Sequence, residues 1–179
     1  NSWSYVSNWE SKTANEIVDD LVDIISKNGC LLLNVGPKSD GTIPQDQKDI
    51  LLQIGSWLDM NGEAVYDTHY WKTFGEGPTE VKKGHHSEGN NKGLSSKDIR
   101  FTEKDNKLYA IVLDWPSDGY VNIETLAKNA TYAKDVKIKN ISVLGSKEKI
   151  EWKQTEEGLK VKMPNVKPGD FAYTIAITH

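Results

Sequence analysis

The sequence has little cysteine and phenylalanine, no long apolar run and no concentration of positive charge. Its single cysteine, Cys30, excludes a disulfide within the chain. No stretch approaches the roughly 18–20 consecutive apolar residues of a membrane-spanning helix, so a membrane is not an expected partner. Lysine and arginine are scattered and the formal net charge is −4, so nucleic acid is not expected either. The 179 residues can bury a core in one or two domains.

The aromatic residues are unevenly distributed among the three types. Six tryptophans and seven tyrosines stand against three phenylalanines. Tryptophan and tyrosine combine an apolar ring with a polar atom, which suits sugar faces and hydrated interfaces. Because each of them can equally fill an ordinary core, this bias indicates carbohydrate binding only together with other signals.

Two helices are expected in the first third of the chain. Thr13-Ala14-Asn15-Glu16 is a capping-box pattern, apolar residues recur at helical spacing over residues 17–25, and Asn28-Gly29 supplies a left-handed stop. Pro44 suits the first residue of a second helix, whose apolar stripe ends at Asn61-Gly62. The first helix is amphipathic, so we expect it to cover the outside of a sheet.

Between these helices, residues 30–35 are predicted to form a short strand. They are apolar except for Asn34, a pattern typical of a strand buried on both faces of a parallel sheet. A parallel sheet needs several such strands, so residues 1–66 look like the end of a larger α/β unit. Alone, the chain would expose apolar helix faces, and we expect it to associate with the rest of that unit or to aggregate.

The second half of the chain alternates apolar and polar residues. Turn signals such as Ser117-Asp118-Gly119 and Pro168-Gly169 separate strand patterns, and the alternation is clearest over residues 171–178. Such spacing indicates an antiparallel β-sandwich. A segment rich in glycine, lysine and serine, residues 72–98, reads as a linker with room for one short strand. The predicted fold is α/β followed by all-β, divided into residues 1–75 and 76–179.

Five motifs occur in the order and at the spacing of a known glycosidase family. They are Ser2-Trp3-Ser4-Tyr5; Leu31-Leu32-Leu33-Asn34-Val35-Gly36-Pro37 with Asp40-Gly41-Thr42-Ile43; Ile54-Gly55-Ser56-Trp57-Leu58; Asn61-Gly62-Glu63-Ala64-Val65-Tyr66; and Phe74-Gly75-Glu76-Gly77-Pro78. On these residues the chain resembles the C-terminal portion of a retaining α-L-fucosidase of glycoside hydrolase family 29. Ser4 and Cys30 depart from the family pattern, which commonly has glycine and a polar residue there.

The resemblance implies a (β/α)8-like barrel followed by a β-sandwich. Residues 1–66 would supply the last loop, helix, strand and helix of the barrel. A complete barrel takes about 250 residues, so an N-terminal barrel segment would be a required partner. The implied substrate is a fucosylated glycan, no cofactor is expected, and the implied location is extracellular, periplasmic or lysosomal.

The resemblance also places the catalytic acids outside this sequence. Retaining glycosidases use two carboxyl groups about 5–5.5 Å apart, one as nucleophile and one as acid/base. In the resembled family these are an Asp on an earlier barrel strand and a Glu shortly before the Ser-Trp-x-Tyr segment, both upstream of Asn1. No catalytic residue is therefore expected here, with Glu10 as the fallback. Asp40 reads as a turn residue and Glu63 as a structural hydrogen-bonding group.

For substrate binding, the resemblance assigns Trp9 as the apolar wall beside the methyl group of fucose, with packing between barrel helices as the alternative. Trp3 and Tyr5 are expected to support the pocket from beneath. Asn34 would need hydrogen-bond partners inside the barrel and is expected to be structural first. His85-His86 has no third ligand nearby in the sequence, so no metal site is predicted.

A different class of function stays open on the sequence alone. The second half could be a carbohydrate-binding or structural β-sandwich without catalysis. The helix–strand–helix pattern of the first half does not fit a free-standing binding module. Binding of fucose by residues 80–179 alone would favour the non-catalytic alternative.

Overall fold

The structure is a computed structural model, and it describes residues 5–7, 11–79 and 93–179. Helix α1 spans Ala14–Ser26 and helix α2 spans Gln45–Asn61, followed by the short 3-10 helix η1, Gly62–Ala64. The predicted capping box is present, because Thr13 Oγ1 accepts from the Glu16 amide while Glu16 accepts from the Thr13 amide. Asn28 takes the predicted left-handed conformation, with φ of 63°. Pro44 precedes α2 as its N-cap rather than opening it.

In the described residues, eight strands form two antiparallel sheets. The strands are β1 His69–Glu76, β2 Ile99–Lys104, β3 Lys107–Val112, β4 Tyr120–Ile123, β5 Asn140–Val143, β6 Trp152–Gln154, β7 Leu159–Lys162 and β8 Tyr173–Thr178. One sheet has the order β1-β2-β3-β8-β5 and the other the order β4-β7-β6. Short 3-10 helices, η3 (Glu124–Leu126) and η4 (Thr131–Asp135), lie between β4 and β5. The predicted antiparallel sandwich is confirmed.

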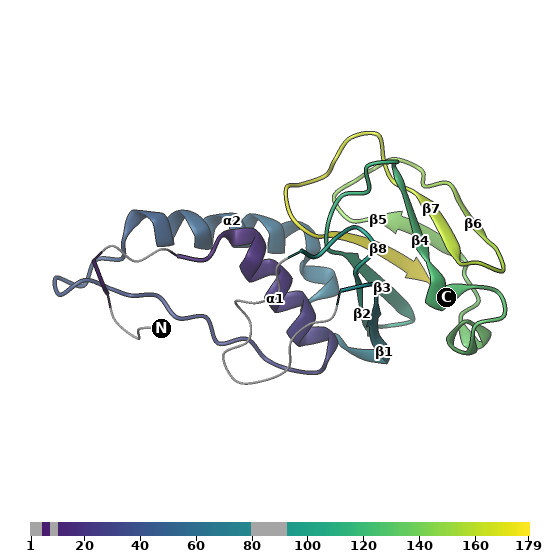
Figure 1. Ribbon diagram of the computed structural model, residues 1–179, viewed down its shortest axis with the longest axis horizontal. Helices are drawn as coiled ribbons and strands as arrows, with labels where there is room; N and C mark the ends of the chain where they lie inside the picture. Colours follow the sequence, from purple (N-terminus) through teal and green to yellow (C-terminus); the bar gives the residue numbers. More distant parts are fainter. Residues whose placement is uncertain (1–4, 8–10, 80–92) are drawn as a thin grey trace.

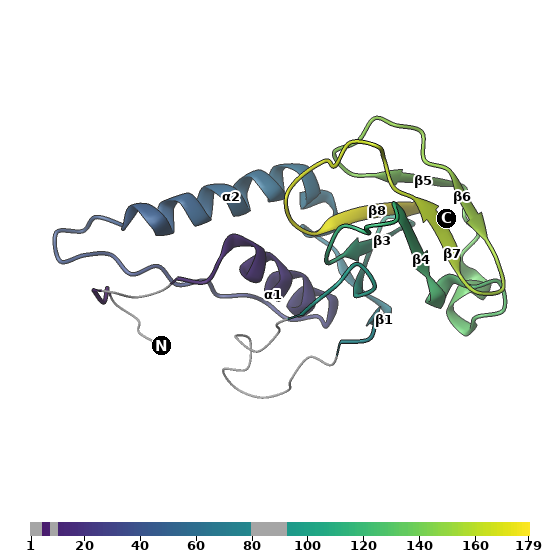
Figure 2. The ribbon, with the colours of Figure 1, turned by 45° about the horizontal axis from the view of Figure 1, so that its top comes forward.

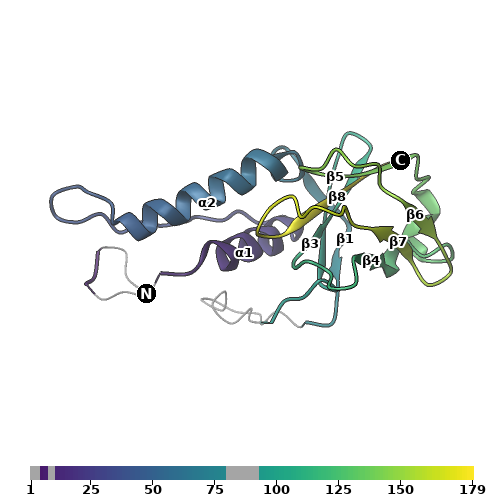
Figure 3. The ribbon, with the colours of Figure 1, turned by 90° about the horizontal axis from the view of Figure 1, so that it is seen from above.

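The molecule has three layers. The helices lie on one side of the five-stranded sheet and the three-stranded sheet lies on the other, while the helices extend away from the sandwich (Figures 1 and 3). Strand β3 shows how alternation builds this arrangement. Leu108, Ala110 and Val112 join the core between the two sheets, whereas Tyr109 and Ile111 join the core shared with the helices. The central strands are therefore covered on both faces.

The prediction of a buried strand at residues 30–35 is wrong for this structure. The segment is not in a strand, and Cys30 and Asn34 are exposed. It runs from the end of α1 back past that helix to the loop where α2 begins (Figure 2). A strand exists only through hydrogen bonds to a neighbouring strand, and every described strand pairs within the sandwich. Helix α1 does cover a sheet, but that sheet is antiparallel and comes from the second half of the chain.

Two smaller differences concern the expected strands. Within the segment read as a linker, β1 is a full edge strand of eight residues, with an irregularity in its pairing to β2 between Tyr70 and Gly75. Alternation over residues 171–178 would place Phe171 on the same side as Tyr173, but Phe171 packs with the helix-side core because β8 begins only at Tyr173. Within the described ranges, no helix combines the length and apolar content needed to cross a bilayer.

Candidate functional site

Of the residues predicted near the N-terminus, Trp3, Trp9 and Glu10 lie outside the described residues. Tyr5 is described and exposed, and Lys38 Nζ lies 5.6 Å from the centre of its ring. This contact places Tyr5 beside the loop that connects residues 30–35 to α2. Asn34, also predicted to support the pocket, has an exposed side chain in this structure, so the structure does not bring it together with Tyr5 in one enclosed site.

The loop before α2 is shaped by Asp40. Its Oδ1 accepts hydrogen bonds from the amide of Thr42 at 2.9 Å and from the Thr42 hydroxyl at 2.7 Å. These two bonds hold the pKa of the Asp40 carboxyl below its ordinary value, although the group is fully exposed. The prediction that Asp40 is a turn residue is confirmed, and its geometry gives it no partner for acid/base chemistry.

Glu63 links η1 to the sheet. Its Oε1 accepts from Lys107 Nζ at 2.6 Å and from the Tyr109 hydroxyl at 2.9 Å. The hydrogen bond from Lys107 is the main reason why the pKa of Glu63 lies below its ordinary value, while burial raises the pKa of the Tyr109 hydroxyl. Glu63 is therefore a structural hydrogen-bonding group, as predicted.

A buried charge cluster joins α1 to β2, and the sequence reading missed it. Arg100 Nε lies 2.6 Å from Asp23 Oδ1, with side chains that are 3% and 7% exposed, and Lys27 Nζ lies 2.6 Å from the other carboxylate oxygen. The ring of Phe74 lies 4.9 Å from Lys27 Nζ and 5.5 Å from the Arg100 guanidinium. One helix and one strand are thus fixed together by a fully engaged carboxylate.

Asp19, one turn earlier on α1, is also buried, but the hydrogen bonds of its carboxylate differ from those of Asp23. Asn15 donates to its Oδ2 at 3.1 Å, but its Oδ1 is buried and has no hydrogen-bond partner among the described residues. Burial, together with the negative charges of Asp20 and Asp114, raises the pKa of Asp19 to about 7, and Arg100 opposes this shift. The only sequence signal was a run of aspartates beside the apolar stripe of α1, which also fits a solvated face.

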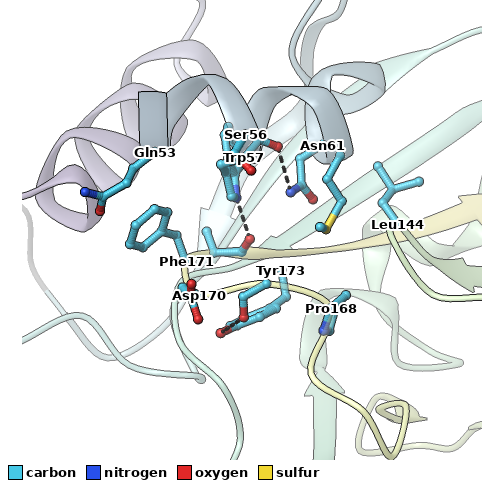
Figure 4. A pocket seen from close by; sticks show the side chains of 12 residues that line it. Gln53, Ser56, Trp57, Asn61, Leu144, Pro168, Asp170, Phe171 and Tyr173 are labelled. Atoms are coloured by element: carbon cyan, nitrogen blue, oxygen red, sulfur yellow. Dashed lines mark hydrogen bonds between the residues drawn. The ribbon is translucent and has the colours of Figure 1, made fainter. Parts of the chain in front are cut away.

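A pocket of about 290 Å³ lies between the second half of α2 and the loop that leads into β8. Figure 4 shows Gln53, Phe171 and Asp170 at one end of it, with Trp57 and Asn61 along the helix. Trp57 Nε1 donates to the carbonyl oxygen of Ala172 at 2.7 Å, which ties the helix to the loop. No sequence pattern could have joined these segments, because Trp57 and Ala172 are 115 residues apart.

No metal centre is apparent in the part of the chain that the structure describes. Within it, no group of three or more His, Cys, Asp or Glu side chains is arranged to hold a metal ion. The pair His85-His86 lies outside the described residues.

Comparison with known proteins finds α-L-fucosidases for both the first and the second half of the chain. The family model "Alpha-L-fucosidase" matches residues 1–63, and "Alpha-L-fucosidase C-terminal domain" matches residues 92–178. Tissue α-L-fucosidase of Rattus norvegicus is 33% identical over 99% of this chain, and that of Homo sapiens is 31% identical over 92%. The chain spans only 35% and 31% of the lengths of these two relatives.

Solved structures agree with the sequence matches. α-Fucosidase of Thermotoga maritima in complex with a mechanism-based inhibitor matches 99% of this chain and 37% of its own, with a TM-score of 0.76 and 29% identity. α-L-Fucosidase isoenzyme 1 from Paenibacillus thiaminolyticus matches 98% of this chain with a TM-score of 0.72 and 27% identity. Because both family models match in succession and the relatives extend over nearly the whole chain, the chain belongs to the α-L-fucosidases of glycoside hydrolase family 29 and corresponds to their C-terminal portion.

Proposed function

We propose that this chain is the C-terminal part of an enzyme that releases terminal α-L-fucose from glycans by a retaining double displacement. The observation that carries the proposal is the succession of the two family models over residues 1–63 and 92–178. The chain spans about a third of the length of its curated relatives, so the remaining two thirds would supply the rest of the active site.

The catalytic carboxylates are assigned upstream of Asn1. A retaining mechanism needs a nucleophile and an acid/base about 5–5.5 Å apart. Two acids of the first domain are committed elsewhere, Asp40 to its own turn and Glu63 to Lys107 and Tyr109. This supports a division of labour in which the chain shapes and supports the pocket while the upstream segment performs the proton transfer and the covalent step.

The exposed apolar side chains near α2 support docking of an upstream barrel segment. Leu32 is 84% exposed and Leu52 is 71% exposed, and the adjacent Leu33 and Leu51 are exposed as well, so these leucines offer apolar contact area to a partner. In the assembled enzyme, residues 30–35 would pair as the last barrel strand, and Asn34 would then face partners in the barrel. The predicted division into residues 1–75 and 76–179 would cut β1, which pairs with β2 in the sandwich, so we place the sandwich from His69 onward and the barrel portion before it.

Substrate binding is assigned to the loop that precedes α1. Trp9 would form the apolar wall against the C6 methyl group of fucose, with Trp3 and Tyr5 beneath it. The contact between Tyr5 and Lys38 supports this role, because it brings the N-terminal loop to the loop before α2. In (β/α)8 barrels, loops that follow the strands carry the active site.

The test is hydrolysis of an aryl α-L-fucoside by the 179-residue chain, alone and combined with the preceding barrel segment. We expect no turnover by the chain alone and turnover by the combination. Turnover by the chain alone would contradict the catalytic assignment, and Glu10 and Asp40 would be the first residues to substitute. If the assembled protein folds but does not hydrolyse the fucoside, the non-catalytic carbohydrate-binding or structural alternative is favoured.

A further inference from the structure

The pocket beside the second half of α2 is preformed. Trp57 Nε1 is held by the Ala172 carbonyl, the Tyr173 hydroxyl donates to the Gly169 carbonyl at 3.1 Å, and Asn61 Nδ2 donates to the Trp57 carbonyl at 3.1 Å. These bonds fix the helix, the loop and the amide that line the pocket. Walls fixed by internal hydrogen bonds are typical of small-molecule sites, because the protein does not have to reorganise to bind.

Met60, which lines the pocket, lies against Gly145 in the turn after β5. The φ of 79° at Gly145 is in the left-handed region that favours glycine, and a Cβ there would also clash with the Met60 side chain. The volume of about 290 Å³ is near the lower limit of small-molecule sites, which suits one ring rather than an extended oligomer.

The lining combines an aromatic ring with hydrogen-bonding groups. The Phe171 ring is partly exposed, and Gln53, Ser56 and Asp170 are exposed polar side chains around the same space. Figure 4 shows that Phe171 and Asp170 come from the loop, whereas Gln53 and Ser56 come from α2. A sugar ring offers the matching chemistry, because its C–H face packs on an aromatic ring while its hydroxyls donate to a carboxylate or an amide oxygen.

The charges at the pocket narrow the ligand class. The lining residues that the structure describes include one acid, Asp170, and no lysine, arginine or histidine. The neighbouring Lys167 directs its Nζ over the Tyr173 ring, at 5.3 Å, instead of contributing to the lining. A phosphate, sulfate or uronate would meet the Asp170 carboxylate, and the nearest cation, Lys167, already interacts with Tyr173 and Asp170, so an anionic ligand is disfavoured.

We propose that this pocket binds one neutral sugar residue, with the Phe171 ring against the apolar face of the sugar and with Asp170 and Gln53 as hydrogen-bonding partners of its hydroxyls. The site uses only residues of this chain and needs no hydrolysis. Its test therefore succeeds or fails independently of the fucosidase activity proposed above.

The experiment is saturation-transfer NMR on the 179-residue chain with methyl glycosides of L-fucose, D-galactose, D-glucose and N-acetylglucosamine. Methyl glucuronide and glucose 6-phosphate serve as anionic probes. We expect saturation transfer to at least one neutral glycoside, and binding at least about tenfold weaker for the anionic probes. Phe171→Ala and Asp170→Asn should each weaken that binding by about tenfold, a loss in the range of one hydrogen bond or one ring contact.

Two matched variants outside the pocket serve as controls. Tyr120→Ala removes an exposed aromatic ring from β4, and Asp67→Asn neutralises an exposed aspartate near η1, so both should leave binding unchanged. Because Phe171 also contacts the helix-side core, near-UV circular dichroism checks folding, and the isosteric Asp170→Asn is the decisive variant. The proposal is overturned if no neutral glycoside receives saturation, if binding survives in Asp170→Asn and Phe171→Ala, or if the anionic probes bind more tightly.

Discussion

In the sandwich, strands β3 and β8 are covered on both faces, whereas α1 and α2 pack against each other and share a core with one face of the five-stranded sheet. Among the described residues, the core between the sheets is built from apolar and aromatic side chains such as Trp71, Phe101 and Leu108. The layer beneath the helices adds buried charge, with Asp19, Asp23 and Arg100 among its members. Leu52 on α2 and Leu32 in the segment after α1 are exposed.

This difference indicates which interactions hold each region in place. The sandwich closes its own core, and apolar contacts alone define how its sheets pack. The helices are positioned on the sheet partly by a buried ion pair, which has strict geometry but a large desolvation cost. We infer that the Asp23–Arg100 pair fixes the position of α1 on the sheet more than it adds net stability.

The largest effect is expected from breaking that pair on one side only. Arg100→Ala leaves Asp23 buried beside a single partly exposed lysine and should lower the free energy of unfolding by about 3–5 kcal/mol. Urea denaturation measures this change, and amide exchange should increase first in α1.

Two further variants test whether the loss of stability comes from leaving one buried charge of the Asp23–Arg100 pair without its partner. Asp23→Leu combined with Arg100→Met removes both charges and should recover most of the lost stability. Lys72→Ala breaks the exposed pair with Asp135, which should leave the free energy of unfolding almost unchanged. If Arg100→Ala costs no more than Lys72→Ala, the pair does not hold α1 on the sheet.

The next prediction concerns the pH dependence of folding stability that the buried Asp19 of α1 causes. The pKa of Asp19 is about 7 in the folded chain against an ordinary value of 3.8. Below about pH 4 the acid is protonated whether the chain is folded or unfolded, so burial costs nothing there. As the pH rises from 4 to 7 the unfolded chain ionises first, and folding stability falls until the folded acid ionises as well.

Asp19→Asn should therefore stabilise the chain at pH 8, by at most about 4 kcal/mol, because a shift of one pKa unit corresponds to about 1.4 kcal/mol. The gain should shrink as the pH is lowered and should vanish near pH 4. Asp67→Asn, at an exposed position, provides the baseline in the same denaturation series. A gain for Asp19→Asn that does not change with pH would show that ionisation of Asp19 is not its cause.

The two regions also differ in how far the sequence predicted them. Local signals were reliable, since the capping box at Thr13, the stop at Asn28 and the alternation along β8 all appear in the structure. The strand at residues 30–35 failed because a strand depends on partners that a local pattern does not contain. Its apolar residues suit a buried strand, but the described chain does not bury them.

The candidate site residues show the same limit: the sequence predicts local contacts and misses those between distant segments. Asp40 was predicted correctly because the chemistry of its turn is local, with Thr42 only two residues away. The structural role of Glu63 was also predicted, but its partners Lys107 and Tyr109 could not be, because they lie 44 and 46 residues further along the chain. The pocket between Trp57 and Ala172 and the partner of Arg100 could not be predicted, because both depend on which helix covers which face of the sheet. The role of Trp9 stays a prediction, since Trp9 lies outside the described residues.

The smallest effect on stability is expected for a matched pair of exposed apolar residues. This pair also compares the two regions most directly. Leu52 on α2 is 71% exposed and Val166 in the sandwich loop is 73% exposed. Replacing either by lysine should change the free energy of unfolding by no more than about 0.5 kcal/mol, because neither side chain is buried.

Their effects on association should differ. Because Leu52 lies on the helix side together with other exposed leucines, Leu52→Lys should shift the chain toward a 20.1 kDa monomer in sedimentation or light scattering. Val166→Lys should leave the association state unchanged, since the sandwich already closes its own core. Equal behaviour of the two variants would contradict the view that the outer face of the helices awaits a partner and the sandwich does not. If only Leu52→Lys also weakens recombination with the upstream barrel segment, that face is where the barrel docks.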